Sequence, residues 1–220
     1  MSDLRPRIAA IPELTVEILD RLRPHYGDIA WWPAEGDWEM MMGAILTQNT
    51  SWRNAEKAIT ALRGAGLLEA QAFHQAIHAD TETVAALIRP SRYFNQKAAR
   101  LGLLADWFAS YDFEIGAASR RPGPELRKEL LSITGIGPET ADCILVYALG
   151  KPYFVVDSYT RKLFEALGVA PPKKYEDFQA LLAEDLPADP RVLGEAHGLI
   201  VEYCKEFHNH LGAGPLEGLQ

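Results

Sequence analysis

A ten-residue stretch, ITGIGPETAD at 133–142, constrains the fold of this chain more than any other part of the sequence. A helical pattern leads into it over residues 125–132, and a second helical pattern leaves it. In the second pattern, apolar residues recur at the i, i+3, i+4 and i+7 positions of one helix face: Ala141, Ile144, Leu145 and Ala148. One helix therefore ends and another begins within about five residues, which predicts a tight αα-hairpin.

The hairpin contains two glycines, Gly135 and Gly137, which permit a positive φ and a tight reversal of the chain. Pro138 suits the first turn of the following helix, where its missing N–H costs nothing. The N–H groups at Gly137 and at the helix start are expected to point outward with the positive end of the helix dipole. Such an arrangement binds anions, and glycines let a phosphate come close. The hairpin alone leaves two interpretations open, a phosphate-binding hairpin and a purely structural one.

The rest of the sequence is also helical in pattern, which predicts an all-α protein. Helices are expected over residues 12–25, 38–47, 51–63, 69–78, 80–88, 93–110, 158–167, 175–186 and 190–208. Residues 119–124 form an expected linker, and the single strand candidate is YFVV at 153–156. The tail at 212–220, GAGPLEGLQ, is expected to be frayed.

Composition narrows the class of protein further. The chain has 220 residues, enough for a sizeable core. The chain has only two cysteines, Cys143 and Cys204, which excludes a disulfide framework and any all-cysteine iron–sulfur or zinc site within the chain. So few cysteines favour a reducing, cytoplasmic compartment. No apolar run suits a membrane span, and the N-terminus lacks the features of a signal peptide. The formal charge of −8 argues mildly against a nucleic-acid partner, but phosphate binding needs only a local face.

The glycine hairpin belongs to a larger sequence pattern. A core helix and a break follow the hairpin, and Asp157 then stands in front of another helix. In this pattern the sequence resembles the helix-hairpin-helix DNA glycosylases of the endonuclease III superfamily. The resemblance implies that Gly135, Gly137 and Thr140 grip the DNA backbone and that Asp157 serves the chemistry. Lys97 and Arg161 are further candidates for phosphate contacts, although a solvated surface charge is the more common role of such a residue taken alone. The alternative role for Asp157 is that of a helix N-cap, and both roles are compatible in one residue.

Two departures from the family pattern refine what the resemblance implies. Bifunctional relatives carry a lysine at the position of Glu139, which attacks the sugar as an amine and allows strand cleavage. A carboxylate cannot do this, so the chain is expected to be monofunctional, although Glu139 also suits the first turn of a helix.

The C-terminal region has one cysteine instead of four, so no iron–sulfur cluster is expected. Zinc at Cys204, His208 and His210 is disfavoured, and Lys205 with Glu202 is assigned to a structural network. No metal and no cofactor are expected.

The segment WWPAEGDWEMMMGAILTQNTSW at 31–52 sharpens the assignment within the superfamily. It resembles the endonuclease III-related 3-methyladenine DNA glycosylases, in which aromatic residues at the positions of Trp31 and Trp52 sandwich the damaged base. Gln48 matches the glutamine that fills the gap left by a flipped base. Trp32 and Glu139 are assigned to the same base pocket. For Trp38, a place in the hydrophobic core is the preferred interpretation.

The resemblance therefore implies a monofunctional glycosylase that releases alkylated purines, most of all 3-methyladenine, from double-stranded DNA, and that acts as a monomer. Two helical domains with a cleft between them are expected, one over residues 34–150 and the other over 1–33 with 151–220. Two alternatives stay open at this point. One is a glycosylase for mismatched or oxidised bases on the same scaffold, and the other is a non-catalytic helix-hairpin-helix module that only binds DNA.

Overall fold

A computed structural model describes residues 8–29 and 31–219 of the chain. All regular secondary structure in these residues is helical, which confirms the all-α prediction. None of the described helices has both the length and the apolar character that a membrane crossing requires. Residues 1–7, on which part of the prediction about a signal peptide rests, lie outside the described part.

The chain separates into two compact units. The terminal unit combines Met1–Trp32 with Pro152–Gln220, and the central unit is Pro33–Lys151.

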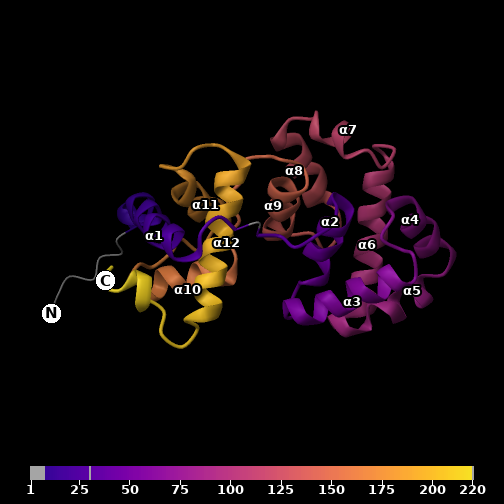
Figure 1. The fold of residues 1–220 in the computed structure, drawn as a ribbon. Coiled ribbons are helices and arrows are strands. Elements are labelled where there is room, and N and C mark those ends of the chain that lie inside the picture. Colours follow the sequence, from indigo (N-terminus) through magenta and orange to yellow (C-terminus); the bar gives the residue numbers. More distant parts are fainter. Residues whose placement is uncertain (1–7, 30, 220) are drawn as a thin grey trace. The chain divides into compact units, whose positions relative to one another are not determined.

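The central unit holds eight α-helices and one short 3-10 helix among its described residues (Figure 1). They are α2 (Asp37–Leu46), α3 (Trp52–Gly64), α4 (Ala70–Ala79), α5 (Thr81–Leu87), η2 (Arg89–Ser91), α6 (Phe94–Ala109), α7 (Ile115–Ser119), α8 (Gly123–Ser132) and α9 (Pro138–Tyr147). Helix α6 packs against α2, α4 and α5, and α9 packs against α2 and α8. Trp38 on α2 is 6% exposed and stacks on Phe108 of α6, which confirms its predicted place in the core.

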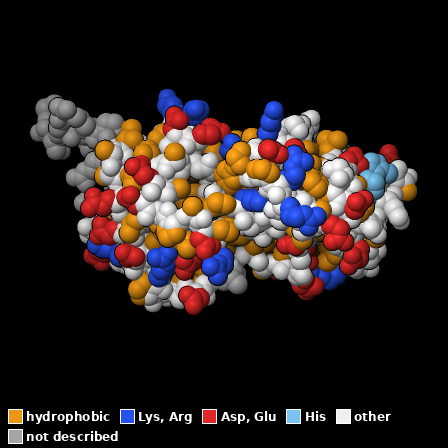
Figure 2. All heavy atoms as spheres, turned by 90° about the horizontal axis from the view of Figure 1, so that it is seen from above, with side chains coloured by type: hydrophobic (Ala, Val, Ile, Leu, Met, Phe, Trp, Pro, Cys, Tyr) orange, Lys and Arg blue, Asp and Glu red, His pale blue; other side chains and the backbone are white. Residues whose placement is uncertain are grey.

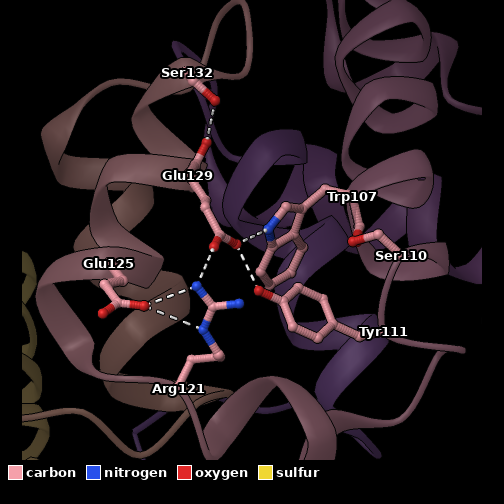
Figure 3. Close-up of polar contacts among 7 residues, drawn as sticks. All are labelled: Trp107, Ser110, Tyr111, Arg121, Glu125, Glu129 and Ser132. Atoms are coloured by element: carbon pink, nitrogen blue, oxygen red, sulfur yellow. Dashed lines mark hydrogen bonds and ion pairs between the residues drawn. The ribbon is translucent and has the colours of Figure 1, made fainter.

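Polar contacts join the two helices of the hairpin to each other and to α6. Asp142 on α9 is fully buried and accepts two hydrogen bonds from Arg127 of α8, at 2.7 and 3.2 Å. Glu129 on α8 accepts hydrogen bonds from Trp107 of α6 at 3.0 Å and from Tyr111, just beyond α6, at 2.6 Å (Figure 3). Contacts between helices, and not a loop, therefore hold the hairpin in place.

The terminal unit is built from segments at both ends of the sequence. Its elements are η1 (Ile8–Ala10), α1 (Ile11–Tyr26), α10 (Ser158–Ala166), α11 (Tyr175–Ala183), α12 (Pro190–Glu206) and η3 (Gly214–Leu216). Helix α12 packs against α1 and α10, while α1 also contacts α11 and η3. Helix α12 contributes most to the core of this unit because ten of its residues are buried.

Three sequence-based expectations are wrong in detail. YFVV at 153–156 is not a strand, because its backbone groups bond to side chains: Tyr175 Oη accepts from Val156 N, and Gln179 Nε2 donates to Phe154 O. The C-terminal tail is not frayed, since Leu216 is fully buried and Arg21 of α1 donates to the carbonyl of Glu217. The expected linker at 119–124 is shorter in the structure, because an unpredicted helix, α7, extends to Ser119 and α8 begins at Gly123.

Candidate functional site

In the hairpin between α8 and α9, Gly135 is fixed by its conformation and by a neighbour. Its φ is +89°, in the region that side-chain-bearing residues avoid. A Cβ at this position would lie 2.2 Å from Nε of Arg100, so the arginine of α6 lies directly across the glycine. The fold itself therefore requires glycine at position 135.

Gly137 behaves differently, because it does not use the positive φ that a glycine permits. Its φ of −91° and ψ of 178° are extended, and any residue adopts them without strain. A Cβ built on Gly137 would have no atom within 4 Å. Its N–H has no hydrogen-bond acceptor among residues 8–29 and 31–219. The fold does not need glycine here, and the missing side chain leaves the N–H of Gly137 open to a ligand.

Gln48, just beyond the end of α2, is bound to this hairpin. Its side-chain nitrogen donates to Oγ1 of Thr140 at 2.9 Å and to the carbonyl of Gly135 at 3.2 Å. Its side-chain oxygen accepts from Arg100 at 2.7 Å. Both ends of the amide are therefore occupied within the central unit. Thr140, 8% exposed, holds Gln48 through its hydroxyl oxygen.

Lys97, predicted as a phosphate contact, has another role in this structure. It is 1% exposed, and its ammonium donates to the carbonyls of Leu46 at 2.8 Å and Ser91 at 2.6 Å. Burial lowers the pKa of Lys97 to about 8, and the charges of Arg100 and Arg92 add to this effect. The structure therefore corrects the assignment: Lys97 anchors the end of α2, from which the Gln48 loop departs.

Arg161, another predicted phosphate contact, is also partly engaged within its own unit. Its guanidinium donates to the carbonyl of Pro172 at 2.7 Å and lies 5.3 Å from the ring centroid of Phe178. These contacts keep the charge near α10 and α11, and a contact with DNA stays a prediction.

In the terminal unit, Asp157 caps α10 as the sequence suggested. One carboxylate oxygen, Oδ1, accepts hydrogen bonds from the N–H and the hydroxyl of Thr160, at 2.8 and 2.9 Å. The other oxygen, Oδ2, lies 3.6 Å from Nε2 of His197 on α12. Burial works to raise the pKa of Asp157, but His197 and the bonds from Thr160 outweigh it and hold the pKa below the ordinary aspartate value. Asp157 is therefore an ionised carboxylate with one oxygen committed to structure and one directed toward His197.

His197 was not identified from the sequence. The residue is 5% exposed, and its side chain lies between the carboxylate of Asp157 and the indole of Trp31. A lone histidine inside an apolar helix pattern, EAHGLIVEY, carries no spacing signal that would pair it with Asp157. Only the packing of α12 on α10 brings the two side chains together.

Trp31 is held in place from α12. A Cβ on Gly198 would lie 2.7 Å from the Trp31 side chain, so the indole uses the space that this glycine leaves. The ring meets that of His197 edge-on at 6.0 Å, and the ammonium of Lys205 lies 4.5 Å from the Trp31 ring centroid. Lys205 also pairs with Glu202 at 3.0 Å. Trp31, His197 and Asp157 therefore form one continuous group of side chains, with Lys205 at its edge.

The predicted site residues thus fall into two groups. Asp157, Trp31 and Lys205 gather with His197 in the terminal unit. Gln48, Gly135 and Thr140 gather with Arg100 in the central unit. Trp32 belongs to the terminal unit, whereas Trp52 begins α3 and Glu139 lies in the first turn of α9. A common base pocket of Trp31, Trp32, Trp52 and Glu139 stays a prediction.

Cys204, one of the three C-terminal candidates for a zinc ligand, is engaged in another contact. Cys204 is 2% exposed and its thiol donates to the carbonyl of Tyr159 at 3.7 Å. Burial raises the pKa of Cys204 to about 12, which keeps the thiol neutral. Within the described residues, Cys204, His208 and His210 are not gathered as metal ligands.

Comparison with known proteins gives consistent matches. A family model for "HhH-GPD superfamily base excision DNA repair protein" matches residues 42–188. The "Putative DNA repair glycosylase MJ1434" of Methanocaldococcus jannaschii is 42% identical over 198 residues, covering 89% of this chain and 89% of that protein. Endonuclease III of Thermotoga maritima is 26% identical over 199 residues, covering 90% of this chain and 84% of that protein.

A solved structure resembles most of the chain as well. The crystal structure of 3-methyladenine DNA glycosylase (MagIII) of H. pylori, bound to 1,N6-ethenoadenine, has a TM-score of 0.73 and 26% sequence identity. The match covers 92% of this chain and 98% of that one.

Proposed function

We propose that this chain, which belongs to the HhH-GPD superfamily of base excision DNA repair proteins, is a monofunctional glycosylase that releases alkylated purines, with 3-methyladenine as the principal substrate. The chain is a DNA glycosylase by its family, and its substrate and type of reaction are what we propose here. The observation that carries it is the group formed by Asp157, His197 and Trp31.

Asp157 suits hydrolysis of an N-glycosidic bond by water. As the bond to the base breaks, the sugar gains oxocarbenium character, and an ionised carboxylate stabilises this positive charge. The low pKa keeps Asp157 ionised at neutral pH, and Oδ2 is the oxygen not used by the helix cap. Water supplies the hydroxyl group that replaces the base, and its proton passes to Asp157 or to solvent. In this account His197 is a positioning residue, because it holds Oδ2 and fixes the pKa of Asp157.

Glu139 supports hydrolysis without strand cleavage. Strand cleavage by a glycosylase of this kind starts from an amine that forms a Schiff base with the sugar. Glu139 lies in the first turn of α9, where a carboxylate favours the helix dipole but offers no amine. We therefore expect free base and an intact abasic strand as products.

The hairpin is the proposed contact with the DNA backbone. Gly137 exposes an N–H at the start of α9 and has open space where a side chain would be. A phosphate oxygen accepts hydrogen bonds from such groups at the positive end of a helix. Among the described residues no contact requires glycine at position 137, so the close approach of a ligand from outside the chain offers a physical reason for glycine there.

The substrate class rests on Trp31 and on the resemblance to the H. pylori enzyme. A purine methylated at N3 is cationic before it leaves, and an indole face attracts cationic rings through its quadrupole. The Trp31 ring is held firmly by Gly198, His197 and Lys205, so little freedom is lost when a base stacks on it. Trp52 is proposed as a second stacking residue.

A base-release assay on a panel of duplexes tests the proposal. DNA carrying 3-methyladenine, 8-oxoguanine or a mismatched base is incubated with the protein, and free bases are separated and counted. We expect release from the 3-methyladenine duplex and none above background from the other two. Release of the oxidised or mismatched base alone would move the protein to another substrate class on the same scaffold.

Because the chain is similar to the endonuclease III of Thermotoga maritima, lyase activity is tested directly. Borohydride reduces a Schiff base to a stable covalent adduct, so an enzyme with lyase activity becomes trapped on abasic DNA. We expect no adduct with this protein, and a covalent adduct with abasic DNA would contradict the proposed mechanism.

A further inference from the structure

A group of three metal-ligating side chains lies outside the site described above, on α4 and α6 of the central unit. His74 and His78 are one turn apart on α4, so their side chains share one face of the helix. Asp106 of α6 faces both of them. Nε2 of His74 lies 3.0 Å, and Nε2 of His78 2.7 Å, from the same oxygen of Asp106, Oδ1.

The ligand atoms lie close enough together to surround a zinc-like ion after a small movement of the side chains. One nitrogen of each histidine and one oxygen of Asp106 all lie within 4.8 Å of one another. In tetrahedral zinc sites, bonds of about 2.0–2.1 Å place neighbouring ligand atoms roughly 3.3 Å apart. The two nitrogen–oxygen distances are slightly below this value, so a small outward rotation of the side chains admits an ion. Two imidazoles and one carboxylate are ligands that divalent zinc prefers.

The surroundings favour a built site over chance proximity. The ring of His74 packs edge-on against Phe113 at 5.5 Å and meets the ring of His78 at 4.7 Å, which limits the rotamers of the pair. The side chains remain 30%, 52% and 46% exposed for His74, His78 and Asp106, so an ion and a water ligand have access. Figure 2 shows histidine side chains gathered beside acidic ones on the surface of the central unit. No other group of three such ligands is found in the described part of the chain.

From this geometry we infer that His74, His78 and Asp106 form a site for a divalent ion of the zinc class. Because the ligands come from two helices that pack on each other, the ion joins α4 to α6. Helix α6 also carries Arg100 and Lys97, which hold the Gln48 loop. The ion is a structural clamp on the helix that supports the hairpin side of the central unit, and it takes no part in base release.

Zinc titration of tag-free, metal-stripped protein tests this inference, because a histidine tag would bind the metal itself. The protein competes with a chromogenic zinc chelator of known affinity, and the thermal unfolding midpoint is followed in parallel. We expect one zinc ion per chain and a higher unfolding midpoint with zinc. Magnesium and calcium should have no such effect, since they prefer oxygen ligands.

Variants separate this site from unspecific binding. His74→Ala, His78→Ala and Asp106→Asn should each weaken zinc binding at least about tenfold and abolish the zinc-dependent rise of the unfolding midpoint. The matched control is His208→Ala in the terminal unit, which should bind zinc as the wild type does. Unchanged zinc affinity in a His74→Ala/His78→Ala double variant, or no binding by the wild type, would overturn the inference. Circular dichroism without zinc verifies that each variant is folded, and the base-release assay is not involved in either result.

Discussion

At the scale of single residues, the account rests on the two oxygens of Asp157. Oδ1 is used by Thr160 at the start of α10, and Oδ2 lies beside His197. The helix cap and the proposed chemistry therefore use different atoms of one side chain. Because the two oxygens differ in use, different substitutions of Asp157 can distinguish its role as a helix cap from its proposed role in the chemistry.

Asp157→Asn should remove base release and keep the fold. Asparagine is as good an N-cap as aspartate, so the start of α10 is preserved while the negative charge is lost. We expect a fall of about 100-fold or more in the single-turnover rate of base release, with DNA affinity retained. Asp157→Ala should in addition cost about 1 kcal/mol of stability through the lost cap. Retained excision by Asp157→Asn would show that the carboxylate is not needed.

His197 gives a prediction about pH. Asp157 has a lowered pKa because its favourable contacts, His197 among them, outweigh its burial. Burial raises the pKa of Asp157, and His197 counteracts this effect. Without His197 the pKa of Asp157 therefore rises. The acidic limb of the pH–rate profile should therefore move to higher pH in His197→Leu and move less in His197→Gln, which keeps a donor. An unmoved limb in His197→Leu would mean that His197 does not act through Asp157.

The two hairpin glycines form a matched pair for mutation. Gly135→Ala should destabilise the protein by about 1 kcal/mol or more, because φ is positive and Arg100 fills the space of the Cβ. Gly137→Ala should leave the unfolding midpoint nearly unchanged and still weaken binding to abasic DNA, since the methyl group covers the proposed phosphate site. Equal DNA affinity in Gly137→Ala and the wild type would contradict the proposed hairpin contact.

At the scale of elements, α6 holds in place the segments that surround the hairpin in the central unit. Arg100 holds Gln48, Lys97 holds the end of α2, and Trp107 bonds to Glu129 of α8. In this structure Gln48 is bonded to the hairpin. If Gln48 fills the gap left by a flipped base, as the family resemblance implies, its bonds to Thr140 and Gly135 must exchange for bonds to DNA.

The Glu129 network in Figure 3 predicts how stability depends on pH. Burial works to raise the pKa of Glu129, but hydrogen bonds from Tyr111 and Trp107 and the charge of Arg121 outweigh it and lower the pKa. A lowered carboxylate pKa contributes stability above the unfolded pKa, and this contribution is lost as the pH falls through the folded pKa. Glu129→Ala should cost about 1–3 kcal/mol at neutral pH, because it leaves Trp107 and Tyr111 without their acceptor. Urea unfolding at neutral and at acid pH should show this difference shrink in acid. A constant difference would argue against ionised Glu129 as its source.

At the scale of the whole molecule, periodicity predicted most helices because their apolar faces are regular. The face of α6 formed by Ala98, Leu101 and Ala105 is fully buried, as a spacing of three and four residues requires. The helix cap by Asp157 and the reversal at Gly135 were also predictable, because both depend on local geometry.

What the sequence left open depends on contacts between distant segments. His197 and Asp157 meet only because α12 packs on α10, and the burial of Lys97 follows from two carbonyls on other elements. His74 and His78 have a helical spacing that suits a metal, but Asp106 becomes their neighbour only through the packing of α6 on α4. No local pattern encodes these pairings, so a single sequence does not reveal them.

The central claim is that this DNA glycosylase releases 3-methyladenine by hydrolysis and leaves the strand intact. Single-turnover incubation with a duplex that carries one 3-methyladenine tests it most directly, with free base and strand length measured in the same sample. The account predicts release of free base by the wild type, no release by Asp157→Asn, and a full-length strand before alkali or heat is applied. Wild-type release no faster than that of Asp157→Asn, or enzymatic cleavage of the strand, would contradict it.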